Sequence, residues 1–400
     1  MKKELQKLML ERYKWLMLGI VGVILLVCVQ NVYGGISNWN YQNKELNKPS
    51  AETQFYKDLK DPDYGYDGKM YLYWDEKTGK DVTTSNFEEY KNYQLKVFAD
   101  DKNEQQMNLF YSEPWFQLTV IAVILGMSVF FFDLKTNFNP LLFSSRFRRQ
   151  DIYTMKIKLL GGTFLGTLVI SKLIVLLALV TMIPKEYLNA TFMELLPSQI
   201  GQIAVLSFIF MASSFAGLIL GEWISGILTL VGFWYTLPVF IGAFPIGLFS
   251  KEKTVFTGGI YFNFYSILEM SKATFASELF KISLAIGLSI VFYLWGKSLY
   301  SKVTLENNGS YLLFNHLRKP VQIVFTFYAF MIMASGNLFE AIEINITGKN
   351  PYGEFIPSLP RAIAFSLVCV AISYLIASLV IYRKNPFRKI GKKEALLPAE

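Results

Sequence analysis

Long apolar runs separated by short polar segments are the main pattern in this sequence. Eight runs are long and apolar enough to cross a membrane as helices: 15–33, 115–132, 159–183, 201–220, 223–248, 279–299, 321–339 and 361–382. Only Gly221 and Glu222 separate the fourth run from the fifth, which predicts a tight hairpin and leaves counts of seven or nine spans open. The pattern predicts an all-α polytopic membrane protein with about eight transmembrane helices.

Basic residues indicate which ends of the spans face the cytoplasm. The flanks 1–14, 133–158, 296–320 and 383–400 carry 5, 6, 4 and 6 Lys or Arg residues against 2, 2, 1 and 2 acidic residues, whereas 37–114 carries 10 against 15. Because basic flanks stay inside, both termini are predicted to be cytoplasmic in a multi-pass protein of the cell membrane. The first run lacks a convincing cleavage site in 31–37, so we expect it to be retained.

Several polar segments lie outside the predicted spans. Residues 1–14 place Leu5, Leu8, Met9 and Tyr13 on one helical face, which predicts an interfacial helix on the inner leaflet or, alternatively, a solvated basic tail. Residues 37–114 are predicted to form a small extracytoplasmic domain, whose aromatic residues form either a partner surface or its own core. The other segments are an outer loop at 241–278, a cytoplasmic loop at 300–320 and a basic cytoplasmic tail at 383–400.

Composition excludes several classes of chemistry. One histidine, His316, and two cysteines, Cys28 and Cys369, are too few to build a His/Cys metal site or an iron–sulfur cluster. No HExxH, GxSxG or pair of mid-span aspartates occurs, so we expect no catalytic residues, no metal and no bound cofactor. The net charge of +8 arises in the inner flanks, which favours contact with anionic lipid and not with nucleic acid.

The inner segment 133–158 is the most informative part of the chain. It combines a short apolar patch with a basic cluster and is too small to fold alone. We therefore predict an amphipathic cytoplasmic element that binds a protein partner, with lipid phosphates as the alternative partner. The residues concerned are Leu141, Leu142, Phe143, Arg146, Phe147, Arg148 and Arg149.

The order of these features resembles the permease subunits of type-2 ATP-binding cassette (ABC) exporters. The resemblance covers about residues 1–300 and rests on the interfacial helix, the inner loop, the tight hairpin and the long outer loop. In the inner loop it is carried by Ser144, Ser145, Arg148, Arg149, Ile152, Tyr153, Lys156 and Lys158, and in the outer loop by Pro245, Gly258, Gly259 and the aromatic run 260–265. It implies a coupling helix near 138–150 that docks on an ATPase subunit, and re-entrant segments within 241–278.

This resemblance also implies the partners and the energy source. The only Gly-Lys-Ser, at 296–298, has Val291 where a phosphate-binding loop needs its first glycine, so ATP and Mg²⁺ are expected to be used by a separate cytoplasmic ATPase. A second permease, identical or similar, would complete a dimer in the lipid membrane. The larger 37–114 domain and the two last spans depart from the plainest members of the family.

Lys172 is the only ionisable residue well inside any predicted span. A lysine there costs roughly 2.5–3.5 kcal/mol, so it should face a cavity or a partner group. It either lines a substrate path or packs against polar groups in the protein interior. The expected cargo is hydrophobic or amphipathic, such as a peptide, an antibiotic or a lipid-like molecule. An ion-coupled secondary transporter, or a membrane sensor or assembly scaffold that uses the outer domain, remains the alternative.

Overall fold

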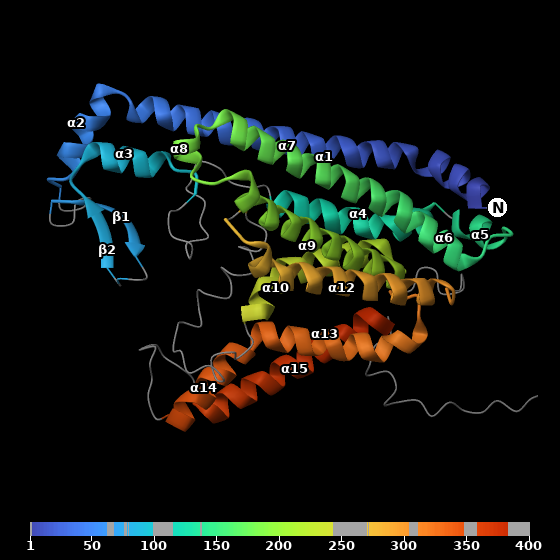
Figure 1. The fold of residues 1–400 in the computed structure, drawn as a ribbon. Coiled ribbons are helices and arrows are strands. Elements are labelled where there is room, and N and C mark those ends of the chain that lie inside the picture. Colours follow the sequence, from blue (N-terminus) through green and yellow to red (C-terminus); the bar gives the residue numbers. More distant parts are fainter. Residues whose placement is uncertain are drawn as a thin grey trace, which may run out of the picture. The chain divides into compact units, whose positions relative to one another are not determined.

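The computed structural model describes residues 2–61, 68–75, 78, 80–98, 115–136, 138–242, 270, 272–303, 311–347 and 358–382. Within these ranges, six helices are long and apolar enough to cross a membrane (Figure 1). Five of them are α1 (Lys2–Leu46), α4 (Trp115–Lys135), α9 (Phe192–Ile219), α12 (Phe275–Tyr300) and α15 (Leu359–Tyr382). The sixth is the continuous helix 149–182, which consists of α6 (Arg149–Lys156), the π-helix η1 (Ile157–Gly161) and α7 (Gly162–Met182). The predicted class, a polytopic α-helical membrane protein, is therefore confirmed.

The two other predicted spans have a different form. In the segment predicted as 321–339, α13 (Arg318–Met333) and α14 (Ser335–Thr347) are bent by 62° at Ala334 and count as a seventh span only if taken together. The Ser335 hydroxyl donates to the Met331 carbonyl at 2.5 Å, and a Ser-Gly pair is a common site of helix kinks. In the segment predicted as 223–248, α10 (Trp223–Gly242) contains a shorter apolar stretch, Gly226–Leu237. The count of eight spans stays a prediction.

Helix α1 runs without a break through the predicted first span and beyond both of its ends. Its 45 residues extend for about 67 Å. Trp15 and Tyr33, at the ends of the predicted span, are each 75% exposed, as expected of aromatic residues at the two membrane interfaces. Residues 2–14 of the predicted interfacial helix form the beginning of α1, and their apolar face is buried: Leu5, Met9 and Tyr13 are at most 1% exposed.

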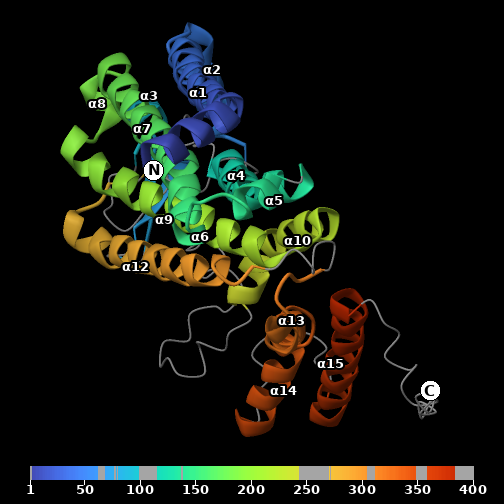
Figure 2. The same ribbon diagram turned by 90° about the vertical axis from the view of Figure 1, so that its right-hand side faces the viewer.

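The chain forms two compact units, which we describe separately. Unit 1 comprises residues 1–126, 151–212 and 266–294, and unit 2 comprises 127–150, 213–265 and 295–400. In unit 1, α1 and α7 lie side by side (Figure 1). In unit 2, α15 packs along α13 and α14 (Figure 2).

The predicted extracytoplasmic domain is a mixed segment packed on the end of α1. It contains α2 (Pro49–Asp58), an antiparallel hairpin of β1 (Met70–Asp75) and β2 (Lys80–Thr84), and α3 (Phe87–Leu95); the hairpin is a small addition to a helical fold. Phe55 packs against Phe87 and Tyr90, with ring centroids 5.5 and 5.1 Å apart. Burial and the nearby Asp58 carboxylate raise the pKa of Tyr90. These contacts support the interpretation that part of its aromatic content forms its own small core.

This segment is also fixed to the rest of unit 1. Trp39 of α1 donates its indole N–H to the Leu95 carbonyl at 3.0 Å, and the backbone N–H of Val97 donates to the Tyr187 carbonyl at 2.8 Å. Tyr187 belongs to the short helix α8 (Lys185–Leu188), which follows α7. Met270 is fully buried in the same apolar cluster.

In unit 2, close helix packing depends on small residues. A Cβ on Gly217 of α9 would lie 2.9 Å from the Met127 carbonyl oxygen of α4, so only glycine allows this backbone approach. Helix α15 packs through small buried side chains at helical spacing: Ala362, Ser366, Cys369, Ser373 and Ala377. The turn after α9 pairs with a short extended segment, since the Gly221 N–H donates to the Tyr311 carbonyl at 2.9 Å. The turn at the predicted hairpin between spans four and five is thus held by a backbone hydrogen bond to the segment around Tyr311.

Most of the predicted outer loop 241–278, including its expected re-entrant segments, lies outside the described residues. The same holds for 62–67, 76–77, 79 and 99–114 of the predicted extracytoplasmic domain, for 304–310 of the loop 300–320 and for the tail 383–400.

Candidate functional site

The predicted coupling segment contains the short helix α5 (Phe138–Phe143) and the turn that leads into α6. Pro140 lies in the first turn of α5, where its missing N–H costs no hydrogen bond. At the other end of α5, the Ser144 and Ser145 hydroxyls donate to the Leu141 and Leu142 carbonyls at 3.1 and 2.6 Å. The sequence therefore builds a single helical turn with defined ends.

One side of this segment is fixed within unit 2. Leu142 is 1% exposed, and the Phe143 ring meets the Tyr300 ring at the end of α12 with centroids 5.8 Å apart. The Arg149 guanidinium lies 4.6 Å from the Phe143 ring centroid, and its Nη1 donates to the Val303 carbonyl at 2.6 Å and the Ser301 carbonyl at 3.3 Å. A cation next to the carbonyls at a helix C-terminus is favourable because it interacts with the negative end of the helix dipole.

The other side of the segment faces outward. Leu141 is 55% exposed, Arg146 and Arg148 are exposed, and Phe147 is half-buried under the Arg146 guanidinium, 5.9 Å from its ring centroid. The seven residues predicted as one docking surface thus form two groups. Leu142, Phe143 and Arg149 attach the segment to its own chain, whereas the exposed residues present an apolar and basic surface.

Helix α6 carries a buried face that the sequence did not reveal as such. Ile152, Tyr153 and Lys156 are all 0% exposed, although 133–158 was predicted to be a cytoplasmic segment. The Tyr153 ring lies 5.6 Å from the Tyr293 ring of α12, and the Thr154 and Tyr293 hydroxyls are 3.2 Å apart. The spacing of positions 152, 153 and 156 on one helical face was the available signal, but it was obscured by the lysine.

Directly after Lys156, the helix widens into the π-helical turn η1 before it continues as α7. The Thr163 hydroxyl donates to the Leu159 carbonyl at 2.8 Å and so provides a partner for a carbonyl group in the widened turn. Phe164 of α7 stacks on Phe210 of α9, with ring centroids 5.0 Å apart.

Lys172 lies in the middle of α7 and is 4% exposed. Its ammonium group donates to the amide oxygen of Gln202 on α9, and the neighbouring Ser171 carbonyl accepts a hydrogen bond from the Cys28 thiol of α1 at 3.4 Å. The adjoining cavity, with Asn31 on its wall, has a volume of about 10 Å³ in which the centre of a water molecule fits. This is room for about one water molecule, so in this conformation Lys172 does not line a path wide enough for a large cargo.

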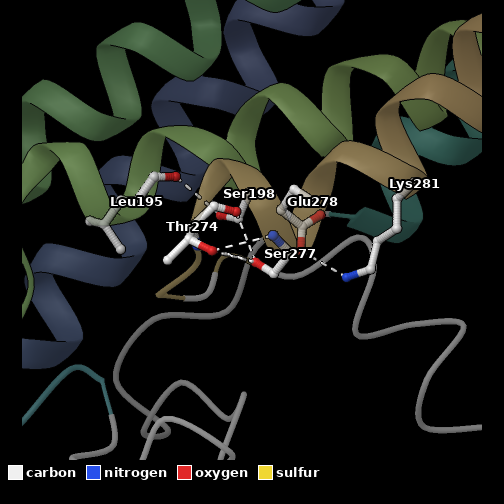
Figure 3. A network of polar contacts seen from close by, with 6 residues as sticks. All are labelled: Leu195, Ser198, Thr274, Ser277, Glu278 and Lys281. Carbon is white, nitrogen blue, oxygen red and sulfur yellow. Dashed lines mark hydrogen bonds and ion pairs between the residues drawn. The ribbon is translucent and has the colours of Figure 1, made fainter.

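Another buried ionisable side chain lies at the beginning of α12 (Figure 3). Glu278 is 5% exposed, and its Oε1 is 2.8 Å from the Lys281 ammonium group. A Cβ on Gly201 of α9 would lie 2.9 Å from Glu278 Oε2, so the glycine leaves space for the carboxylate. The first turn of α12 is capped by Thr274, whose hydroxyl accepts from the Ser277 backbone N–H at 3.2 Å.

Together these residues form a buried polar layer in unit 1. Helix α9 contributes a face of buried polar side chains, Ser198, Gln199 and Gln202, each at most 4% exposed. Lys172 meets this helix from α7, and Glu278 meets it from α12. Sequence reasoning found Lys172 but placed Glu278 in the outer loop. The Thr274-Ser277 capping pattern was the signal that α12 begins before it.

The chemistry of this layer is that of ion pairing and hydrogen bonding. Among the described residues, no group of three or more His, Cys, Asp or Glu side chains could hold a metal ion. Comparisons with protein-family models, with curated proteins and with solved structures found no match for this chain.

Proposed function

We propose that this chain is the permease subunit of an ABC exporter, driven by a separate cytoplasmic ATPase subunit and working beside a second permease. The observation that carries this proposal is the form of the segment 138–149. It is a short helix between two membrane helices, fixed to its own chain on one side and exposed on the other.

This form suits the transmission of force. A docking element that moved freely on its own chain would absorb the displacement of a partner, whereas the Arg149 and Phe143 contacts tie the segment to the end of α12. The exposed Leu141 offers an apolar side chain for a partner cleft, and Arg146 and Arg148 offer cations for an acidic rim.

The cargo we propose is hydrophobic or amphipathic. The described membrane helices are strongly apolar, and the cavity beside Lys172 has room for about one water molecule. A peptide, an antibiotic or a lipid-like molecule fits such a membrane domain better than an inorganic ion does.

The test is co-purification of the tagged chain from its native membrane in mild detergent, followed by mass spectrometry and an ATPase assay. We expect a stoichiometric nucleotide-binding subunit. The double variant Leu141→Asp, Arg148→Glu should lose this subunit while inserting normally. Lys319→Glu, a charge reversal at an exposed position of another element, is the matched control.

Two results would contradict the proposal. One is a chain that purifies without any ATPase under conditions that preserve other membrane complexes. The other is an ATPase that stays bound to the double variant as well as to the control, which would remove the assignment of 138–149 as the docking segment.

A further inference from the structure

A small cavity lies between α1 and α7 in unit 1. Cys28 and Asn31 of α1 and Ser171 and Lys172 of α7 line it, together with apolar side chains. The volume in which the centre of a water molecule fits is about 10 Å³. This is the room that one buried water molecule needs, and it is too little for a second water molecule or a hydrated ion.

The cavity lies at a depth where bulk water is absent. Tyr33 ends the predicted first span and is 75% exposed, as expected at the edge of the hydrocarbon layer. Asn31 and Cys28 precede it by two and five residues, which places them about 3 and 7 Å inside that edge. The Cys28 thiol donates to the Ser171 carbonyl at 3.4 Å, so the adjacent Lys172 lies at a similar level. Polar groups at this depth need partners within the protein.

The polar side chains around the cavity have the donors and acceptors that a water molecule requires. The Lys172 ammonium group has three donors, and the Gln202 amide oxygen accepts from it. The Ser171 hydroxyl donates to the Leu168 carbonyl at 2.9 Å, and its oxygen can still accept. The Asn31 side chain has no hydrogen-bond partner among the described residues.

We propose that this cavity binds one water molecule, which accepts a hydrogen bond from the Lys172 ammonium group and donates to the Asn31 amide oxygen and the Ser171 hydroxyl. Three hydrogen bonds are the usual number for a buried water molecule. Lys172 then joins three helices at one level, α9 directly through Gln202 and α1 through the water. The proposal concerns this chain alone and is independent of the proposed ATPase and cargo.

Hydroxyl-radical footprinting of the full-length protein in phosphatidylcholine nanodiscs tests the site, because X-rays split bound water and the radicals oxidise the side chains beside it. The chain supplies its own reporter and control. Cys28 lines the cavity, whereas Cys369 packs in the small-residue face of α15, and the two are 5% and 4% exposed. Oxidation mapped by mass spectrometry should be several-fold faster at Cys28. Equally slow oxidation of both cysteines would overturn the proposal.

Two variants of neighbouring residues test whether Asn31 holds the water. Asn31→Leu removes the proposed acceptor and should lower oxidation of Cys28 to the rate of Cys369. Gln30→Leu makes the same kind of change at the preceding, exposed position, which does not line the cavity, and should leave the rate unchanged. Equal rates in the two variants would show that the radicals reach Cys28 from elsewhere and would overturn the proposal.

Unfolding temperatures provide a second measurement. If Asn31 and Lys172 share one water molecule, the double variant Asn31→Leu, Lys172→Met should unfold at about the same temperature as Lys172→Met alone. The effect of Gln30→Leu should instead add to that of Lys172→Met. Additive effects of Asn31→Leu and Lys172→Met would contradict the proposal, as would a high-resolution density map in which Lys172 bonds directly to Asn31.

Discussion

Arg149 is the side chain whose loss should release the coupling segment from the rest of unit 2. Replacing it with methionine keeps an unbranched side chain but removes the donors to the Val303 and Ser301 carbonyls and the cation over Phe143. A hydrogen bond to a charged group contributes about 1.5–3 kcal/mol, and a cation–π contact at a partly exposed site contributes about 0.5–1 kcal/mol. Because Arg149 is partly exposed and water replaces some of these contacts, we expect a net loss of about 2–3 kcal/mol.

Hydrogen exchange measured by mass spectrometry provides the assay. A loss of about 2–3 kcal/mol in local opening raises the exchange rate of peptides from 138–148 by about 30- to 150-fold. Arg148→Met removes the same kind of side chain from the next, exposed position and should leave exchange unchanged. Equal exchange in both variants, or no change in Arg149→Met, would refute the assignment of Arg149 as the internal anchor.

Three further predictions concern the close helix contact in unit 2, the buried polar layer, and the segment 49–95 packed on the end of α1. Gly217→Ala should lower stability by about 1–3 kcal/mol, seen as a lower unfolding temperature in detergent, because the new methyl group meets the Met127 backbone; Gly162→Ala, where nothing lies within 4 Å, should not. Lys172→Met removes the hydrogen bond that joins α7 to Gln202 of α9, so it should reduce transport in reconstituted vesicles while leaving insertion unchanged; full transport would show that transport does not need this bond. Burial and the Asp58 carboxylate raise the pKa of Tyr90 in the folded state, so its contribution to stability is complete below the unfolded value of about 10 and is lost as pH rises through the folded value. Tyr90→Phe should therefore flatten the loss of stability as pH rises above about 10.

The membrane helices were largely predictable because hydropathy is averaged over about 20 residues, the length of one span, so single residues change it little. Runs such as 159–183 and 361–382 coincide closely with α7 and α15. The continuity of α1 was not predictable from hydropathy, since its two ends are polar. Those ends stay helical because Leu5, Met9 and Trp39 are buried by contacts that come from distant parts of the sequence.

The polar layer shows why sites are harder to predict than spans. Lys172 was found because it interrupts an apolar run, whereas Glu278 and Lys156 lie where an apolar run begins or ends. At such positions a charge is ordinarily solvated, and a sequence gives no sign that another helix covers it. Gly201 is the clearest case, because its role is to leave space for a carboxylate 77 positions further along the chain.

The coupling segment and α6 both contact the last two turns of α12 and the residues just after it. Phe143 and Arg149 contact Tyr300 and the carbonyls that follow it, and Tyr153 contacts Tyr293, seven residues earlier. A displacement of this segment by a docked partner would therefore reach α12 directly, through aromatic rings and charged hydrogen bonds. This route is additional to the one through α4 and α7, the membrane helices on either side of the segment in the chain. Helix α12 begins at Phe275, and Glu278 in its first turn is buried and pairs with Lys281 at 2.8 Å. In the proposed exporter, the end of α12 is thus the part of the membrane domain that a movement of the coupling segment would reach first.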